Sequence, residues 1–151
     1  MDIILRLFPI NAQGICEELH VPLPPIAIDA CQATRAMYDA DGYAPPWGGY
    51  LAMLDEVCVG TCAFRTSPKL GAVEIAYFTF PEFEHRGIAT RMATLLIEIA
   101  RRAGVSCVTA QTLASIGASQ TILRKLEFAH ERTFEHPEDG TLWEWRLQVA
   151  N

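Results

Sequence analysis

The residues best suited to chemistry lie in segment 84–90, which reads EHRGIAT and stands where a helix is expected to begin. A helix N-terminus leaves its first amide groups unpaired and carries about half a positive charge, so it binds phosphate groups readily. Gly87 and Ala89 leave room for an anion there, and Arg86 adds positive charge. The segment predicts an anion-binding loop. The alternative is an ordinary strand–loop–helix connection, which uses the same small residues.

The elements on either side of this loop are the most clearly patterned in the chain. Residues 73–80 are rich in aromatic and β-branched types and end at a proline, which predicts a strand. Residues 87–103 carry apolar side chains at helical spacing, and Gly104 follows where a helix would end. The loop is therefore expected between a buried strand and an amphipathic helix.

The rest of the chain alternates short strands and helices. Strands are expected over 3–8, 50–54, 57–64, 107–111, 128–134 and 142–147, and helices over 12–20, over a segment from an N-cap at Asp29 to about Tyr38, and over 119–126. This order predicts an α/β (α+β) domain built around one sheet.

Length and composition indicate one folded domain. At roughly 100–200 residues per domain, 151 residues form one. Half of the residues are hydrophobic, which excludes a disordered chain, and no apolar run reaches the ~18 residues of a membrane-spanning helix. The first residues, MDIILR, do not resemble a secretion signal, so a cytoplasmic protein without a membrane partner is expected.

The charge distribution points to a small ligand. The net charge of −6 argues against nucleic acid as a partner. Residues 86–132 nevertheless hold seven basic and three acidic side chains. This excess indicates either solvated helix faces or a pocket for a small, highly charged anion.

The cysteines predict neither disulfides nor a metal site. There are five of them, an odd number in a chain with no secretion signal. Cys58 and Cys62 have no second pair and no nearby histidine to complete a zinc site. We expect buried thiols and no bound metal.

In combination, these motifs resemble the GNAT superfamily of N-acetyltransferases, and most of all its bacterial ribosomal-protein acetyltransferase-like branch. The resemblance rests on the strand VEIAYF (73–78), the loop RGIAT (86–90), Ala118-Ser119 followed by LRKLEF (123–128), and the terminal hairpin. It implies one N-acetyltransferase domain over 1–151, with a divergent segment 1–46 and a family-like core 47–147. It also implies a mixed, mostly antiparallel sheet of about seven strands flanked by about four helices.

The resemblance further implies that acetyl-CoA is the co-substrate and that its acetyl group passes to a primary amine by direct attack in a ternary complex. Glu74 would be the general base, although a structural role for this carboxylate is an alternative. The backbone N–H of Phe78 would stabilise the thioester oxygen. Ser119 would contact the pantetheine arm or lie near the thiolate, or it would cap the helix that follows. The expected cofactor-binding residues are Phe78, Thr79, Phe80, His85, Arg86, Gly87, Ile88, Ala89, Thr90 and Ser119.

Several residues depart from the family pattern. Glu84 replaces a usual Gln or Arg, and His85 replaces a frequent Gly. Ile116 replaces an Asn that touches pantetheine. Leu123 and Glu127 replace the Tyr and Gly of a common Tyr-x-x-x-Gly-Phe motif, which removes the usual general acid.

These departures leave a second hypothesis open, namely a non-catalytic acyl-CoA sensor or scaffold. The sequence does not identify the acceptor, which the family allows to be a small molecule or a peptide. A homodimer is also possible in this family. A hydrolase of the α/β type is excluded because the chain has no G-x-S-x-G motif.

Overall fold

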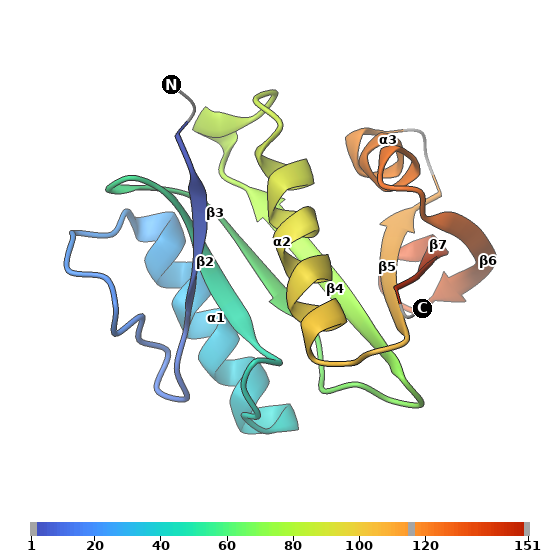
Figure 1. Ribbon diagram of the computed structural model, residues 1–151, viewed down its shortest axis with the longest axis horizontal. Coiled ribbons are helices and arrows are strands. Elements are labelled where there is room, and N and C mark those ends of the chain that lie inside the picture. Colours follow the sequence, from blue (N-terminus) through green and yellow to red (C-terminus); the bar gives the residue numbers. More distant parts are fainter. Residues whose placement is uncertain (1–2, 115–116, 150–151) are drawn as a thin grey trace.

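The computed structural model describes residues 3–114 and 117–149, which form a single seven-stranded sheet with helices on both faces (Figure 1). The strands are β1 (Leu5–Pro9), β2 (Gly49–Leu54), β3 (Val57–Phe64), β4 (Ala72–Thr79), β5 (Cys107–Leu113), β6 (Ala129–His136) and β7 (Gly140–Gln148). The helices are α1 (Pro25–Asp41), α2 (Ile88–Arg102), α3 (Ala118–Lys125) and the short 3-10 helix η1 (Pro81–Phe83). The predicted α+β class and mostly antiparallel sheet are confirmed, with three α-helices among the described residues where about four were expected.

The strands lie in the order β1-β2-β3-β4-β5-β7-β6. Every neighbouring pair is antiparallel except β4 and β5, which are parallel and joined through α2. The parallel pairing covers only Ala72–Ile75 of β4 against Cys107–Ala110 of β5. Beyond these four residue pairs both strands continue without pairing to each other, so the sheet opens between them.

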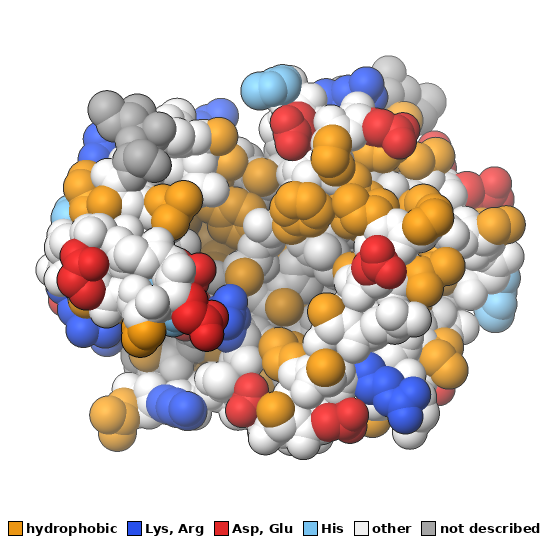
Figure 2. Space-filling model, turned by 180° about the vertical axis from the view of Figure 1, so that it is seen from behind, with side chains coloured by type: hydrophobic (Ala, Val, Ile, Leu, Met, Phe, Trp, Pro, Cys, Tyr) orange, Lys and Arg blue, Asp and Glu red, His pale blue; other side chains and the backbone are white. Residues whose placement is uncertain are grey.

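Two hydrophobic cores fix the helices to the sheet. On one face, α2 packs through Ile88, Met92 and Leu96 against strand residues that include Val73 and Ile75. On the other face, the α1 residues Ala27 and Cys31 join a second core with Leu51, Met53 and Cys58. All five cysteines are free and buried, as expected. Seen from the side of α1, the surface is hollowed between the part that carries α1 and the C-terminal hairpin (Figure 2).

The helix predicted over 12–20 is wrong. This segment consists of turns, because the Asn11 side-chain oxygen accepts hydrogen bonds from the backbone N–H of Gln13 and of Ile15, at 3.0 and 2.9 Å. An asparagine that binds nearby backbone groups in this way competes with helix formation. Gly14 adopts a φ of 77°, and Cys16 is buried in the second core.

The start predicted for the next helix is also wrong. It begins at Pro25, not after Asp29, and its N-cap is Pro24. A proline at the first helical position loses nothing, since the N–H that it lacks has no partner within the helix. The proline-rich segment 22–25 therefore leads directly into α1, with Pro25 as its first residue.

Tyr38 of α1 ties three segments together. Its buried hydroxyl donates to the carbonyl of Ile10 at 2.7 Å and accepts from the N–H of Gly49 at 2.9 Å. Tyr38→Phe leaves both backbone groups without this partner. We expect it to lower the free energy of unfolding by about 1–3 kcal/mol, measured by chemical denaturation. Tyr43→Phe, at an exposed ring, is the matched control; equal stability of the two variants would contradict the bridging role.

Candidate functional site

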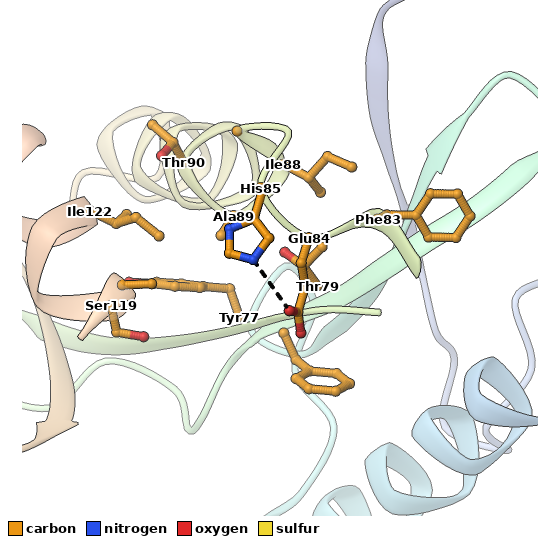
Figure 3. Close-up of a pocket in the computed structure, with 13 residues that line it drawn as sticks. Tyr77, Thr79, Phe83, Glu84, His85, Ile88, Ala89, Thr90, Ser119 and Ile122 are labelled. Carbon is orange, nitrogen blue, oxygen red and sulfur yellow. Dashed lines mark ion pairs between the residues drawn. The ribbon is translucent and has the colours of Figure 1, made fainter. Parts of the chain in front are cut away.

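A cavity of about 390 Å³ lies where the C-terminal half of β4 meets the N-termini of α2 and α3 (Figure 3). Its lining residues are Tyr77, Phe78, Thr79, Phe83, Glu84, His85, Gly87, Ile88, Ala89, Thr90, Ala118, Ser119 and Ile122. Most of the residues expected to bind a cofactor are thus brought to one place.

The N-terminus of α2 is open towards this cavity. Gly87 is the N-cap, with a φ of 75°, and no described side chain caps the helix. The first backbone hydrogen bond at this end runs from the N–H of Arg91 to the carbonyl of Gly87. A Cβ at Gly87 would meet no described atom within 4 Å. The helix therefore presents unpaired amide groups and the positive end of its dipole to open space, as an anion site requires.

Two of the expected residues lie elsewhere. The guanidinium of Arg86 lies over the ring of Phe83, 5.7 Å from its centroid, and does not line the cavity. Phe80 is 3% exposed and belongs to the core beneath α1. His85 does line the cavity, adopts a φ of 65°, and lies 3.9 Å from the carboxylate of Glu84 (Figure 3).

The strand register changes the expected donor for the thioester oxygen. The N–H of Arg65 donates to the carbonyl of Glu74, and the N–H of Phe80 donates to the carbonyl of Val59. Antiparallel pairs alternate, so Phe78, which pairs with Thr61, also directs its N–H towards β3. The expectation for the Phe78 N–H therefore does not fit this register.

The same alternation leaves other backbone groups in the opening between β4 and β5. On the β4 side these belong to Tyr77 and Thr79, which lie opposite Cys62 and Gly60 of β3 at the positions whose N–H and C=O groups point away from β3. They form an unpaired strand edge, and such an edge can accept an extended ligand as an additional strand.

Two hydroxyl groups on the α2 face of β4 are buried without a regular partner. Neither Tyr77 Oη nor Thr79 Oγ1 has a hydrogen bond of regular geometry within the described part of the chain. Ser119 is near enough to Tyr77 to moderate its pKa, which burial raises to about 12. Most buried hydroxyl groups in proteins have a partner, so Thr79 Oγ1, which has none among the described residues, and Tyr77 Oη, whose only polar neighbour there is Ser119, are groups that a polar ligand could satisfy.

A second cavity, of about 260 Å³, lies on the other side of the opening. Its lining residues are Arg65, Glu74, Ile75, Ala76, Tyr77, Ala110, Gln111, Thr112, Leu113, Ser119, Asp139 and Leu142. Tyr77 and Ser119 line both cavities, so the two meet where the strands separate.

Glu74 is one of the titratable groups that line this second cavity, with Arg65 and Asp139. Its side chain is 26% exposed, and burial raises its pKa above the ordinary glutamate value. Arg65, whose Nε lies 3.6 Å from Oε2, partly offsets this effect, while Glu144 adds to it. A carboxylate with a raised pKa is suited to accept a proton near neutral pH.

Ser119 lies in the first turn of α3 but does not cap it. The N-cap is Gly117, so the alternative assignment of Ser119 as a cap is wrong. The side chain is exposed and points into the space beside Tyr77 (Figure 3).

The structure shows the surroundings of two residues that depart from the family pattern, Leu123 and Glu127. Leu123 is fully buried in the core beneath α2, so its position offers no group to the cavity. Glu127 has a φ of 71°, the left-handed conformation that the family's glycine adopts easily. Ile116 lies outside the described residues.

Within residues 3–114 and 117–149, no group of three or more His, Cys, Asp or Glu side chains is arranged to hold a metal ion. None of the helices in these ranges is long and apolar enough to cross a membrane.

Comparison with known proteins agrees with this geometry. A family model described as "Acetyltransferase (GNAT) domain" matches residues 13–129. A search of curated proteins found no match.

Solved structures share the fold at low sequence identity. A RimL ribosomal L7/L12 alpha-N-protein acetyltransferase matches with a TM-score of 0.73 and 16% identity, over 97% of this chain and 94% of the other. The ribosomal-protein-S18-alanine N-acetyltransferase from Escherichia coli gives 0.66 and 12%, over 85% and 92%. YncA, a putative acetyltransferase from Salmonella typhimurium solved with acetyl-CoA, gives 0.62 and 20%, over 79% and 73%.

The environment of Glu74 generates a direct test. We expect a carbon-detected NMR titration to give this carboxyl a pKa above the ordinary glutamate value. Arg65→Gln removes the opposing positive charge and should raise the pKa further. Arg35→Gln, at an exposed arginine on α1, is the control and should leave it unchanged. An ordinary pKa in the parent protein would show that the carboxylate is solvated.

Proposed function

Because the chain belongs to the acetyltransferase (GNAT) family and is an acetyl-CoA-dependent enzyme, we propose that it transfers the acetyl group to a primary amine by direct attack in a ternary complex. The observation that carries this proposal is the meeting of two cavities at the opening of the sheet. One leads to the uncapped N-terminus of α2, and the other contains Glu74. Donor and acceptor can therefore approach the same point from opposite faces.

The first cavity is suited to acetyl-CoA, which supplies an acetyl group activated as a thioester. The loop and first turn of α2 would hold the pyrophosphate through the amides of His85, Arg86, Gly87, Ile88, Ala89 and Thr90. The pantetheine arm would lie along the unpaired edge of β4, beside Phe78 and Thr79. Ser119 would contact the same arm from α3.

The negative charge that develops on the thioester oxygen needs a hydrogen-bond donor. The register leaves the N–H of Tyr77 on the open side of β4, so we assign this role to Tyr77 in place of Phe78. A preorganised backbone donor of this kind typically lowers the barrier by ~2.7–4 kcal/mol.

Glu74 would take the proton from the arriving ammonium. Its side chain lies on the face opposite Tyr77, because neighbouring residues of a strand alternate between faces. An amine that enters the second cavity therefore meets the carboxylate on its way to the opening. Arg65, which follows β3, forms an ion pair with the Glu74 carboxylate and helps to position it. Burial keeps the pKa of Glu74 above its ordinary value.

The acceptor would be a small-molecule or peptide amine. The second cavity has the volume of a small group, and Glu74 and Asp139 suit a cation. Two of the similar structures are titled as acetyltransferases of ribosomal proteins, which makes a protein N-terminus one acceptor to test. A homodimer and the division of the chain at residue 46 stay predictions.

Acetyl-CoA should stabilise the protein through the N-terminus of α2. At 100 times the Kd, linkage gives ~2.7 kcal/mol, or roughly 5–10 °C in Tm for a chain of this size. Gly87→Asp should abolish most of this shift, because it adds negative charge at the anion site. Gly87→Asn is the matched control, since Asn and Asp tolerate a positive φ equally well and only one is charged.

Thermal melting with and without acetyl-CoA measures both variants. A parent protein that shows no shift would refute the proposed co-substrate. Equal shifts in the Asp and Asn variants would mean that the pyrophosphate binds elsewhere. A shift without thiol release in the presence of any amine from a library would favour the non-catalytic alternative.

Glu74→Gln should lower kcat by ~10²–10⁴-fold at neutral pH and leave the thermal shift with acetyl-CoA unchanged. In the parent, activity rises with pH through the raised pKa of Glu74 as the carboxylate loses its proton. The variant lacks this carboxylate and its pH dependence. Higher pH should partly restore its kcat, because more of the amine is already neutral when it arrives.

Thiol release measured across pH distinguishes a base from a structural carboxylate. Glu56→Gln, in the exposed turn between β2 and β3, is the control for loss of one negative charge. Parental turnover of Glu74→Gln at pH 7 would assign Glu74 a structural role.

A further inference from the structure

Tyr77 is the buried phenol that the proposed mechanism leaves without a role for its side chain. Tyr77 lines both cavities. Figure 3 shows the ring extending from β4 with its hydroxyl end towards Ser119. The hydroxyl is buried and has no hydrogen bond of regular geometry to the described residues.

A buried hydroxyl whose hydrogen bonding is incomplete lowers the stability of the protein, by up to about 1–3 kcal/mol when it has no partner at all. Such a cost at the centre of a ligand-binding site indicates that the partner is part of the ligand. The position on β4 is informative, because the backbone of the same residue faces the opening in which the thioester would lie. The side chain extends from the same residue on the α2 face, beside the cavity in which the proposed co-substrate would lie.

The surroundings keep this phenol protonated. Burial raises the pKa of Tyr77 to about 12, and Ser119 offsets only part of this effect. The titratable side chains that line the same cavity are Glu84 and His85, which lie in the loop before α2, and Glu74 lies on the opposite face of the strand. Tyr77 is thus a hydrogen-bond donor at every pH at which the enzyme works.

We propose that the Tyr77 hydroxyl donates a hydrogen bond to the sulfur of CoA as the thioester bond breaks, with Ser119 as its positioning residue. This inference rests on the proposed function. It names a leaving-group contact in a chain whose family pattern would place a tyrosine at position 123, where a buried leucine stands.

The step balances without transfer of the Tyr77 proton. The amine nitrogen forms a bond to the acetyl carbon, and the carbon–sulfur bond breaks with its electron pair going to sulfur. The amine loses its protons to Glu74 and then to solvent. Tyr77 keeps its own proton and stabilises the thiolate, which takes a proton from water after it leaves. Hydrogen bonds to a charged acceptor are about twice as strong as neutral ones, so the contact is strongest when sulfur is an anion.

The sharpest test measures the CoA thiol itself, without an acceptor and without turnover. In the enzyme–CoA complex, the ultraviolet absorbance of the thiolate is followed against pH, and the complex with desulfo-CoA is subtracted to remove the adenine signal. Tyr77→Phe should reduce the ratio of thiolate to thiol by about ten- to a hundred-fold at a given pH, as expected for loss of a hydrogen bond to a charged group. Ser119→Ala should cause a smaller decrease.

Tyr50→Phe is the matched control. Tyr50 is also buried, but its hydroxyl donates to the carbonyl of Pro46, away from both cavities. It should leave the thiol unchanged and lower the Tm. Tyr77→Phe removes a hydroxyl without a regular partner, so it should fold with a Tm equal to or above that of the parent.

In turnover, Tyr77→Phe should lower kcat by about 10²-fold and leave the KM for acetyl-CoA unchanged. Equal thiol titrations in parent and Tyr77→Phe complexes, or parental kcat in the variant, would overturn the inference and leave the proposed function intact. A parent protein that fails to bind CoA would overturn both.

Discussion

The site depends on the place where the parallel pairing of β4 and β5 stops. Four residue pairs hold the two strands together, and beyond Ile75 and Ala110 they separate. Each strand keeps its other neighbour, β3 for β4 and β7 for β5, so the sheet stays intact on both sides of the opening. Backbone groups along the opening lose their strand partners, and buried backbone groups need partners. An extended ligand, as in the proposed binding of the pantetheine arm, could pair with the β4 edge and supply them.

The side chains of β4 alternate between its two faces, and in the proposed mechanism this places the two substrates on opposite sides of one strand. Tyr77 and Thr79 face α2 and the open N-terminus of that helix, whereas Glu74 faces the side on which α1 packs. The donor and the acceptor can therefore occupy different faces of the sheet and still meet at its opening. The polar side chains are few, and each has a distinct environment: an uncapped helix end, a phenol whose pKa is raised, and a carboxylate whose pKa is raised but opposed by Arg65.

Packing on the far side of α3 supports this arrangement. The buried side chain of Gln120 donates to the carbonyl of Leu113 at 2.9 Å, which ties α3 to the end of β5. This contact keeps the helix that carries Ser119 against the opening. Trp145, almost fully buried, donates to the hydroxyl of Thr112 at 2.9 Å and anchors β7 to the same strand. The β5 side of the opening is thus rigidly held, as a site that positions two substrates requires.

The locally patterned elements could be predicted from the amino-acid sequence alone. The strand 57–64 and the helix after Gly87 follow from alternation and helical spacing, and small residues at the helix start predict the uncapped N-terminus that the structure shows; anion binding there stays a prediction. Prediction from the sequence failed where a side chain replaced a backbone partner, as Asn11 does in the turns that stand in place of the helix expected over 12–20. It also failed at Pro25, since a proline is expected to break a helix but this one stands at the first helical position, where proline is tolerated.

Which functional groups of the site lie close together depends on the tertiary structure. The family resemblance implied that the N–H of Phe78 stabilises the thioester oxygen. The direction of each N–H, however, depends on the register between β4 and β3, which are separate segments of the chain. Nothing in the sequence was a reason to select Tyr77. Its proposed role depends on the separation of β4 from β5 and on the position of α3, which places Ser119 beside the phenol. Local pattern specifies whether a segment is a strand or a helix, whereas the chemistry of this protein depends on contacts between segments that are far apart in the chain.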